Sequence, residues 1–407
     1  MKSSNSIVAG RFAALRLCSL LPVLFAVCPV QAQSDSSALV ESGVVAAKSC
    51  PKEESTKFVC GVANSEDLVQ LPNSHWVVST GKPGPGVPSG GLFLIDARNK
   101  VVEPFFPTAR SQFQQDQKLF GGCPGKVDEE GFHSEGLNVR ATGNGNYTLY
   151  VINHGGRESF VNHGGRESTE IFRINVQAKK PTITWIGCVV TPPMPQTNQR
   201  AVGNAVAPLP NDAFAITINP ASALNDMKNP EVAGKLATGQ ITGRVMIWSP
   251  ATGWKMVPGS ELAGNNGIEA SPDGKWLYVS ALFELGVYRL SVGKTPVDRT
   301  VVKTDFHPDN IRWGDDGFLY LTGPGVTDRG IFAEALACMT SSVCASPYKV
   351  LRIDPRTLQS DELVDEPGGP LFGLGTGVAK VGNEIWISSV RGTRIAVFPL
   401  KPAPRSK

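Results

Sequence analysis

Acidic or carboxamide side chains recur at a similar distance before an aromatic residue in this 407-residue sequence. One residue precedes each of six aromatic markers at this offset. In chain order they are Glu66, Glu135, Asn204, Asn266, Asn310 and Thr376, and Asp309 lies beside Asn310. Their distances to the markers are ten, twelve, ten, ten, eight and ten positions. Carboxylate and amide oxygens are hard ligands that select Ca²⁺, or less favourably Mg²⁺ or Mn²⁺, over zinc. The repeated offset therefore predicts a cation site, whereas a single such residue would only reflect the frequency of Asn and Asp in turns.

The elements that must position these side chains are six predicted β-hairpins. In each, an apolar strand leads into a polar turn and a second strand opens on an aromatic residue. The hairpins span 69–80, 138–153, 206–217, 269–280, 311–323 and 378–389, and the markers are Trp76, Tyr147, Phe214, Trp276, Phe318 and Trp386. Their mean interval of about 62 residues predicts an all-β fold, a six-bladed β-propeller in which each hairpin forms the two innermost strands of a blade. A β-sandwich needs no such recurrence.

Composition agrees with short strands and tight turns, because Gly (43) and Pro (31) are abundant and charged residues make up only 18%. The formal charge of +3 resides in Lys2, Arg11 and Arg16, so the chain after residue 32 is formally neutral. Without a basic run we expect no nucleic-acid partner.

Residues 1–32 have the pattern of a signal peptide, with basic residues, an apolar stretch from Leu17 to Val30, and Ala32 before the predicted cleavage. An N-terminal membrane anchor is the alternative, but the stretch is short and holds two prolines. We expect a periplasmic or secreted protein with no membrane span after signal removal. The predicted organisation is an N-terminal segment at 33–60, the propeller at 61–401 and a tail at 402–407.

Six cysteines remain after residue 32, an even number that favours disulfides in an oxidising compartment. Cys50 with Cys60 and Cys338 with Cys344 could close local loops, which leaves Cys123 for Cys188, although other pairings stay open. The absence of a CxxC pair argues against a thiolate zinc site.

Several local motifs resemble the serum paraoxonase/arylesterase group within the six-bladed lactonases that include gluconolactonases and regucalcin. The motifs are Ser65-Glu66-Asp67-Leu68, Val151-Ile152-Asn153-His154, Asn266-Gly267-Ile268 followed by Ser271-Pro272-Asp273-Gly274, and Asp309-Asn310-Ile311. The resemblance runs from about Asn64 to Leu400. It implies that one catalytic Ca²⁺ is held in the channel by Glu66, Asn204, Asn266, Asp309 and Asn310.

The sequence departs from this family at two positions near the expected site. The family's second, structural Ca²⁺ uses an acid at the position of Asp67 and another at position 205, where this chain has Ala205, so we do not expect a second ion. Glu135 takes the place of one histidine of the proposed water-activating pair, and His133 lies two residues earlier.

The other histidine of that pair falls in a duplicated stretch, so either His154 or His163 could supply it, and we favour His154 because a strand leads directly into it. The family's disulfide to the last strand also lacks its second cysteine. Closure of the ring is therefore expected to rest on strand pairing.

The resulting expectation is a calcium-dependent hydrolase of small lactones or aryl esters, with Glu135, His154 and Asp309, in that order, as candidate general bases. The alternative is a non-catalytic propeller that binds a partner and holds a structural metal in its channel. A condensing enzyme resembling strictosidine synthase is less favoured, since it needs no such ligand ring. No G-x-S-x-G motif for a serine hydrolase occurs.

Overall fold

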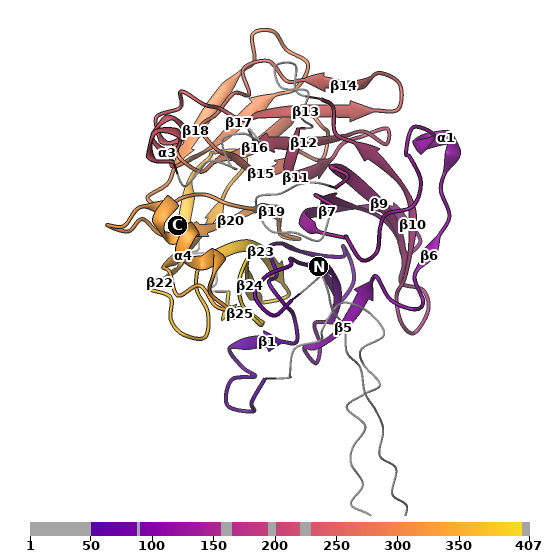
Figure 1. Ribbon diagram of the computed structural model, residues 1–407, viewed down its shortest axis with the longest axis horizontal. Helices are drawn as coiled ribbons and strands as arrows, with labels where there is room; N and C mark the ends of the chain where they lie inside the picture. Colours follow the sequence, from indigo (N-terminus) through magenta and orange to yellow (C-terminus); the bar gives the residue numbers. More distant parts are fainter. Residues whose placement is uncertain (1–49, 88–89, 156–164, 194–200, 220–228, 401–407) are drawn as a thin grey trace, which may run out of the picture. The chain divides into compact units, whose positions relative to one another are not determined.

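A ring of six small β-sheets forms the fold in the computed structural model (Figure 1). The model describes residues 50–87, 90–155, 165–193, 201–219 and 229–400. The predicted signal peptide and C-terminal tail lie outside the described residues. The ring confirms the expected six-bladed β-propeller.

Each sheet is a blade of four antiparallel strands, and the first blades follow one another along the chain. Blade 1 holds β2 (Leu68–Gln70), β3 (Trp76–Gly81), β4 (Gly91–Asp96) and β5 (Val101–Phe106). Blade 2 holds β7 (Ser134–Gly143), β8 (Asn146–Asn153), β9 (Ser168–Asn175) and β10 (Thr182–Val190), with β6 (Gln112–Phe113) added in parallel to β10. Blade 3 holds β11 (Val202–Pro208), β12 (Phe214–Asn219), β13 (Arg244–Ser249) and β14 (Gly253–Met256).

The remaining blades complete the ring. Blade 4 holds β15 (Asn265–Ala270), β16 (Trp276–Ala281), β17 (Gly286–Ser291) and β18 (Arg299–Lys303). Blade 5 holds β19 (Ile311–Trp313), β20 (Leu319–Pro324), β21 (Tyr348–Ile353) and β22 (Ser360–Glu366). Blade 6 holds β23 (Gly375–Val381), β24 (Glu384–Ser389), β25 (Arg394–Pro399) and β1 (Phe58–Cys60). The helices of the described residues are α1 (Gln117–Phe120), α3 (Pro230–Ala237) and α4 (Ile331–Met339).

All six predicted hairpins are present, as β2–β3, β7–β8, β11–β12, β15–β16, β19–β20 and β23–β24. In each sheet the first strand of the hairpin lies at one edge, and Figure 1 shows β7, β11, β15, β19 and β23 near the centre of the ring. The hairpins therefore supply the innermost strands, as predicted, and residues at the start of these strands share one end of the channel.

The ring is closed by strand pairing between distant parts of the chain. Strand β1 pairs antiparallel with β25, with Phe58 opposite Ala396 and Cys60 opposite Arg394. The propeller thus begins at Phe58, three residues before the expected start at 61, because the end of the predicted N-terminal segment supplies the outer strand of blade 6.

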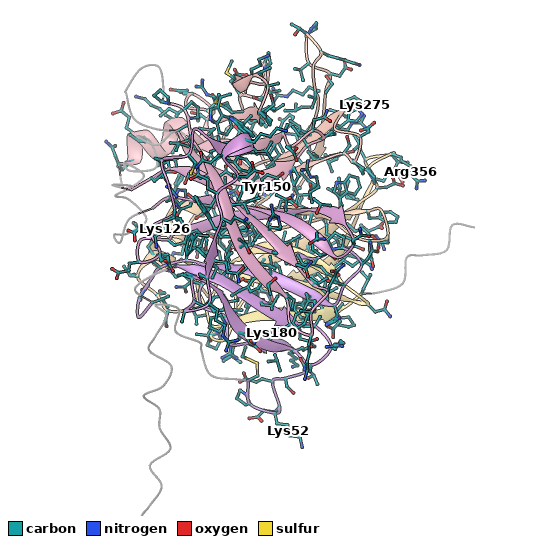
Figure 2. All side chains as sticks on the ribbon, turned by 90° about the vertical axis from the view of Figure 1, so that its right-hand side faces the viewer. Lys52, Lys126, Tyr150, Lys180, Lys275 and Arg356 are labelled. Carbon is teal, nitrogen blue, oxygen red and sulfur yellow. A yellow bond between two sulfur atoms is a disulfide. The ribbon has the colours of Figure 1, made fainter. Side chains whose placement is uncertain are left out.

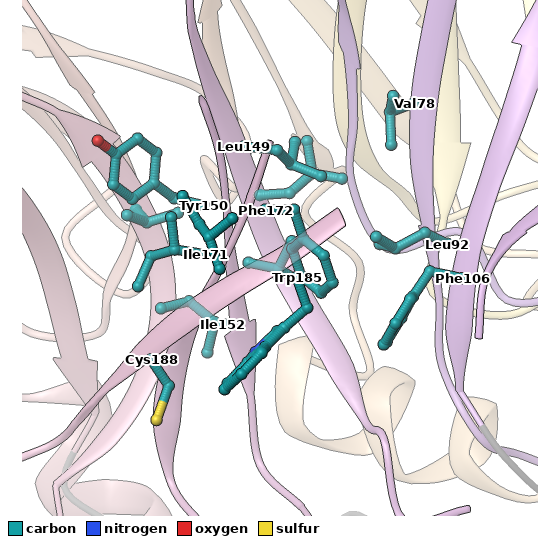
Figure 3. Close-up of a cluster of buried hydrophobic side chains, with 14 of the residues drawn as sticks. Val78, Leu92, Phe106, Leu149, Tyr150, Ile152, Ile171, Phe172, Trp185 and Cys188 are labelled. Atoms are coloured by element: carbon teal, nitrogen blue, oxygen red, sulfur yellow. The ribbon is translucent and has the colours of Figure 1, made fainter. Parts of the chain in front are cut away.

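Large apolar side chains fill the space between neighbouring blades. Figure 3 shows Phe106 of blade 1 facing Phe172 and Trp185 of blade 2. The rings of Phe106 and Phe172 are 4.8 Å apart at 67°, an edge-to-face contact. Burying each such side chain stabilises the fold by about 1.5–3 kcal/mol. Because successive side chains of a strand point to opposite faces of the sheet, every second residue can face the neighbouring blade.

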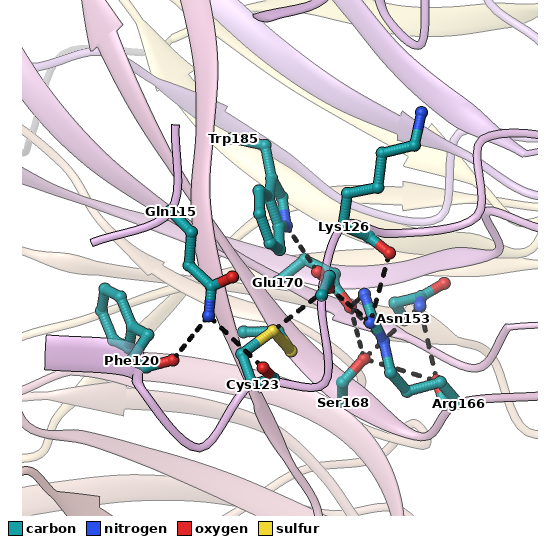
Figure 4. Close-up of a disulfide and its surroundings, with 11 residues drawn as sticks. Gln115, Phe120, Cys123, Lys126, Asn153, Arg166, Ser168, Glu170 and Trp185 are labelled. Atoms are coloured by element: carbon teal, nitrogen blue, oxygen red, sulfur yellow. Dashed lines mark hydrogen bonds and ion pairs between the residues drawn. A yellow bond between two sulfur atoms is a disulfide. The ribbon is translucent and has the colours of Figure 1, made fainter. Parts of the chain in front are cut away.

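Three disulfides join Cys50 to Cys60, Cys123 to Cys188 and Cys338 to Cys344, the pairing considered from the sequence. Cys123 follows α1 and Cys188 lies in β10, so their bond fixes the loop outside blade 2 (Figure 4). Gln115 Nε2 supports this loop by donating to Phe120 O at 2.9 Å.

Surface cations are spread over separate elements, as Figure 2 shows for Lys126, Lys180, Lys275 and Arg356. Within the described residues, no helix is both long enough and apolar enough to span a membrane.

Candidate cation and catalytic site

The five predicted cation ligands gather at one end of the channel. Glu66, Asn204, Asn266 and Asp309 line a common cavity of about 190 Å³. Asn310 reaches the same place, because its Nδ2 donates to Glu66 Oε1 at 2.8 Å. The residues come from blades 1, 3, 4 and 5, and they meet because each lies at or just before the start of an innermost strand.

One oxygen of each ligand residue is buried and has no hydrogen-bond partner among the residues that the structure describes. These atoms are Glu66 Oε2, Asn204 Oδ1, Asn266 Oδ1, Asp309 Oδ1 and Asn310 Oδ1. A buried oxygen left without a partner costs about 1–3 kcal/mol of stability. Five such oxygens at one place therefore indicate a bound group that all five can coordinate. Oxygen donors of this kind suit a hard cation such as Ca²⁺.

The electrostatics of the cavity also favour a cation. Burial, followed by the charges of Glu135, Asp67 and Asp309, raises the pKa of Glu66 well above its usual range. Burial and the charges of Glu135 and Asp67 raise the pKa of Asp309 in the same way. A divalent cation would compensate these crowded carboxylates, so the residues present fit the expected ion.

Two glycines allow the ligand strands to approach one another. A Cβ on Gly267 of β15 would lie 2.3 Å from Asp309 O, and one on Gly136 of β7 would lie 2.5 Å from Asn204 O. Both distances are shorter than any relaxed contact, so a larger residue at either place would displace the backbone of a ligand residue.

Hydroxyl groups fix the ligand backbones from neighbouring blades. Thr376 Oγ1 donates to Glu66 O at 2.7 Å, and Ser388 Oγ donates to the same oxygen at 3.1 Å. Thr217 Oγ1 donates to Asn266 O at 2.5 Å and accepts from Ala205 N at 3.0 Å. Thr376, the sixth residue at the recurring offset, therefore holds a ligand residue in place and also lines the cavity.

Beside the ligands lies a row of four buried side chains of alternating charge. Lys82 Nζ forms a short ion pair with Glu135 Oε2, and His154 Nε2 lies 3.4 Å from the same oxygen. His154 Nδ1 lies 3.0 Å from Glu167 Oε2. This arrangement is the charged row, Lys82–Glu135–His154–Glu167.

The charged row combines predicted residues with others that the sequence reasoning missed. Glu135 enters from β7, and His154 directly follows β8, as expected from the strand that leads into it. Lys82 and Glu167 were missed because neither belongs to a repeating sequence pattern. Glu167 does lie in the second copy of the duplicated stretch, and it contacts His154 of the first copy. His163 lies outside the described residues.

The row fixes the protonation of its two central members. Burial would lower the pKa of His154, but the charges and hydrogen bonds of Glu167 and Glu135 raise it to about 9. Burial would raise the pKa of Glu135, but Lys82 and His154 hold it well below the usual range. Near neutral pH, Glu135 is therefore an ionised carboxylate that lies between Lys82 and the imidazolium of His154.

Most of the remaining wall of the cavity is apolar, although His133 and Asn219 also line it. Leu236 comes from α3 and Phe332 from α4, and Phe283 comes from the loop after β16. The rings of Phe283 and Phe332 stack with centroids 5.0 Å apart. The cavity thus combines a polar floor of ligand oxygens with an apolar roof.

A scan against protein-family models found no match, and a sequence search of curated proteins found no relative. Among solved structures, the chain is similar to a luciferin-regenerating enzyme, with a TM-score of 0.46, 14% identity and coverage of 84% of this chain and 92% of that one. A gluconolactonase from Xanthomonas campestris gives a TM-score of 0.46, 16% identity and coverage of 84% and 87%. A virginiamycin B lyase from Staphylococcus aureus gives a TM-score of 0.42, 12% identity and coverage of 85% of this chain and 98% of that one. At these identities the likeness concerns the fold alone.

Proposed function

We propose that this protein hydrolyses small lactones or aryl esters with the help of one Ca²⁺ held by Glu66, Asn204, Asn266, Asp309 and Asn310. The observation that carries the proposal is the set of five buried, unpartnered oxygens in one cavity with an ionised carboxylate beside them. When bound, such a cation polarises a substrate carbonyl and stabilises negative charge on its oxygen.

The charged row supplies the proton-handling groups in this proposal. Glu135 is the first candidate to accept the proton of the attacking water, since it lines the cavity and stays ionised. His154 is protonated near neutral pH, so its role is to orient Glu135 by hydrogen bonding rather than to act as the base. Asp309 is the other candidate base, since it also lines the cavity.

The apolar roof supports a substrate whose carbonyl group carries an apolar ring or chain. Phe283, Phe332 and Leu236 would cover that part while the carbonyl faces the polar floor. The three disulfides suit an oxidising compartment, so we propose that the protein works in the periplasm or after secretion.

The test is a panel of small lactones and aryl esters assayed with the mature protein, before and after treatment with EDTA and after Ca²⁺ is restored. We expect turnover that EDTA abolishes and Ca²⁺ recovers. Turnover that is unaffected by EDTA would contradict the metal-assisted scheme. Calcium binding without turnover of any panel member would instead favour the non-catalytic binding module.

A further inference from the structure

A buried arginine of blade 5 contacts groups from blades 1, 2 and 4. Arg312 lies in β19, two residues after Asn310, and only 2% of its surface is exposed. Its Nη2 makes short contacts with Asp67 Oδ2 of blade 1 and Leu137 O of blade 2. Its Nη1 lies 3.8 Å from Glu269 Oε2 of blade 4. One guanidinium thus joins groups from four blades, its own included.

The partners of Arg312 form a set of oxygens that requires a positive charge. Asp67 is fully buried, and within the described part of the chain its two oxygens accept from Arg312 and from the backbone N–H groups of Leu68 (2.8 Å) and Leu137 (3.0 Å). Glu269 is also buried, and its carboxylate accepts hydrogen bonds from Asn138 Nδ2 and from the backbone N–H of Ala270. The two carboxylates stay ionised at this depth only beside a cation, and the same guanidinium satisfies the buried carbonyl oxygen of Leu137.

A metal ion could in principle supply that charge, but the residues do not leave a place for it. Asp67 is the residue at which the paraoxonase resemblance located a second, structural ion, and its Oδ2 already accepts from Arg312. The other expected carboxylate is missing, because position 205 is a buried alanine. The donor set around Asp67 therefore fits a guanidinium that is already present and does not fit a second Ca²⁺.

We propose that Arg312 replaces a second metal ion beside Asp67, so that the chain binds a single Ca²⁺ and Arg312 supplies the positive charge next to the Asp67 and Glu269 carboxylates. A guanidinium suits this role because it is always charged and presents several fixed donors to oxygens in different directions. The proposal concerns ion stoichiometry and the stability of the channel, and it stands apart from whether the protein hydrolyses lactones.

The first test counts ions on the mature wild-type protein after metal removal. Calorimetric titration with CaCl₂, checked by elemental analysis, should give one Ca²⁺ per chain, and D67N should leave that number unchanged. Two ions per wild-type chain, one of them lost in D67N, would overturn the proposal. Failure to bind any Ca²⁺ would contradict the ion of the proposed function, and the unfolding test below would then decide on Arg312.

The second test compares Tm values in metal-free buffer. Arg312→Met keeps much of the side-chain length but leaves the Asp67 and Glu269 carboxylates without their cation, so we expect Tm to fall by about 5–10 °C. Millimolar CaCl₂ should then raise the Tm of R312M more than that of R312K, which keeps a positive charge in the channel. Arg356→Met, at a side chain that is 82% exposed, is the matched control and should leave Tm unchanged. An unchanged Tm in R312M would overturn the proposal, and if that variant does not fold, the wild-type ion count and R312K decide it.

Discussion

Glu66 and Asn310, which are 244 positions apart in the sequence, are joined by a 2.8 Å hydrogen bond from Asn310 Nδ2 to Glu66 Oε1. The bond leaves Glu66 Oε2 and Asn310 Oδ1 as the buried oxygens without a partner. It therefore sets the orientation of both side chains before any ion binds, which reduces the reorganisation that binding requires.

Glu66→Gln should weaken Ca²⁺ binding by at least about tenfold, because it removes one of the two carboxylate charges in the predicted ligand set while it keeps the side-chain volume. Calorimetric titration of the metal-free protein measures the change. Glu362→Gln, on the outer strand β22, is the matched control and should bind Ca²⁺ like the wild type. Unchanged affinity in E66Q would remove Glu66 from the ligand set.

Glu135→Gln should lower kcat for an activated aryl ester by about 10²–10³-fold, since a carboxamide cannot accept a proton from water. Calcium affinity is measured in parallel to show that the ion site is intact, and Glu129→Gln, at a partly exposed side chain, serves as the control. Full activity in E135Q would transfer the role of base to Asp309.

Stability should depend on pH through His154. Its folded pKa of about 9 lies above the ordinary value of 6.5, so its contribution is complete below about pH 6.5 and is lost as pH rises through 9. The loss is on the order of 3 kcal/mol. The free energy of unfolding in urea at pH 6, 7.5 and 9 should fall for the wild type and vary less for H154Q. A matched H75Q variant, at a partly exposed histidine, should keep the wild-type slope, and an equal slope in H154Q would contradict the assignment.

Much of the fold follows from local patterns that are visible in the sequence. Each blade begins with a hairpin built from contiguous residues, so its strands, its turn and the ligand before it lie within one short window. This is why the ring of hairpins and the gathering of Glu66, Asn204, Asn266, Asp309 and Asn310 could be predicted. The Cys123–Cys188 bond joins positions 65 apart, and from the sequence it was one of several open pairings.

Two of the residues that the sequence did not reveal, Arg312 and Lys82, have partners in other blades. Arg312 meets Asp67 across 245 positions, and Lys82 meets Glu135 across 53. Neither cation occurs at a recurring offset, and each would be an ordinary surface residue in an isolated hairpin. Only the closed ring places them in the channel, so their charge pairing depends on tertiary structure.

Gly267→Ala should disturb the ion site without touching a ligand side chain. The new Cβ would lie 2.3 Å from Asp309 O, so the backbone of Asp309 and Asn310 must move. We expect Ca²⁺ affinity to fall by about tenfold or more. Gly234→Ala is the control, because this helical position in α3 has open space around it and Ala favours the helix. Wild-type affinity in G267A would show that the strands are not in tight contact at this point.

Phe332→Ala should change substrate preference more than catalysis. Phe332 stacks on Phe283 in the apolar roof, whereas the proposed chemistry takes place on the polar floor. Removing the ring should raise KM by about tenfold for a lactone with a long alkyl chain and change it little for an unsubstituted lactone, because only the former contacts the roof. Leu336→Ala, at a 42% exposed position of the same helix, controls for a general effect on α4. An equal rise in KM for both lactones would mean that the roof acts on the shape of the whole cavity, which would contradict its role in selecting the apolar part of the substrate.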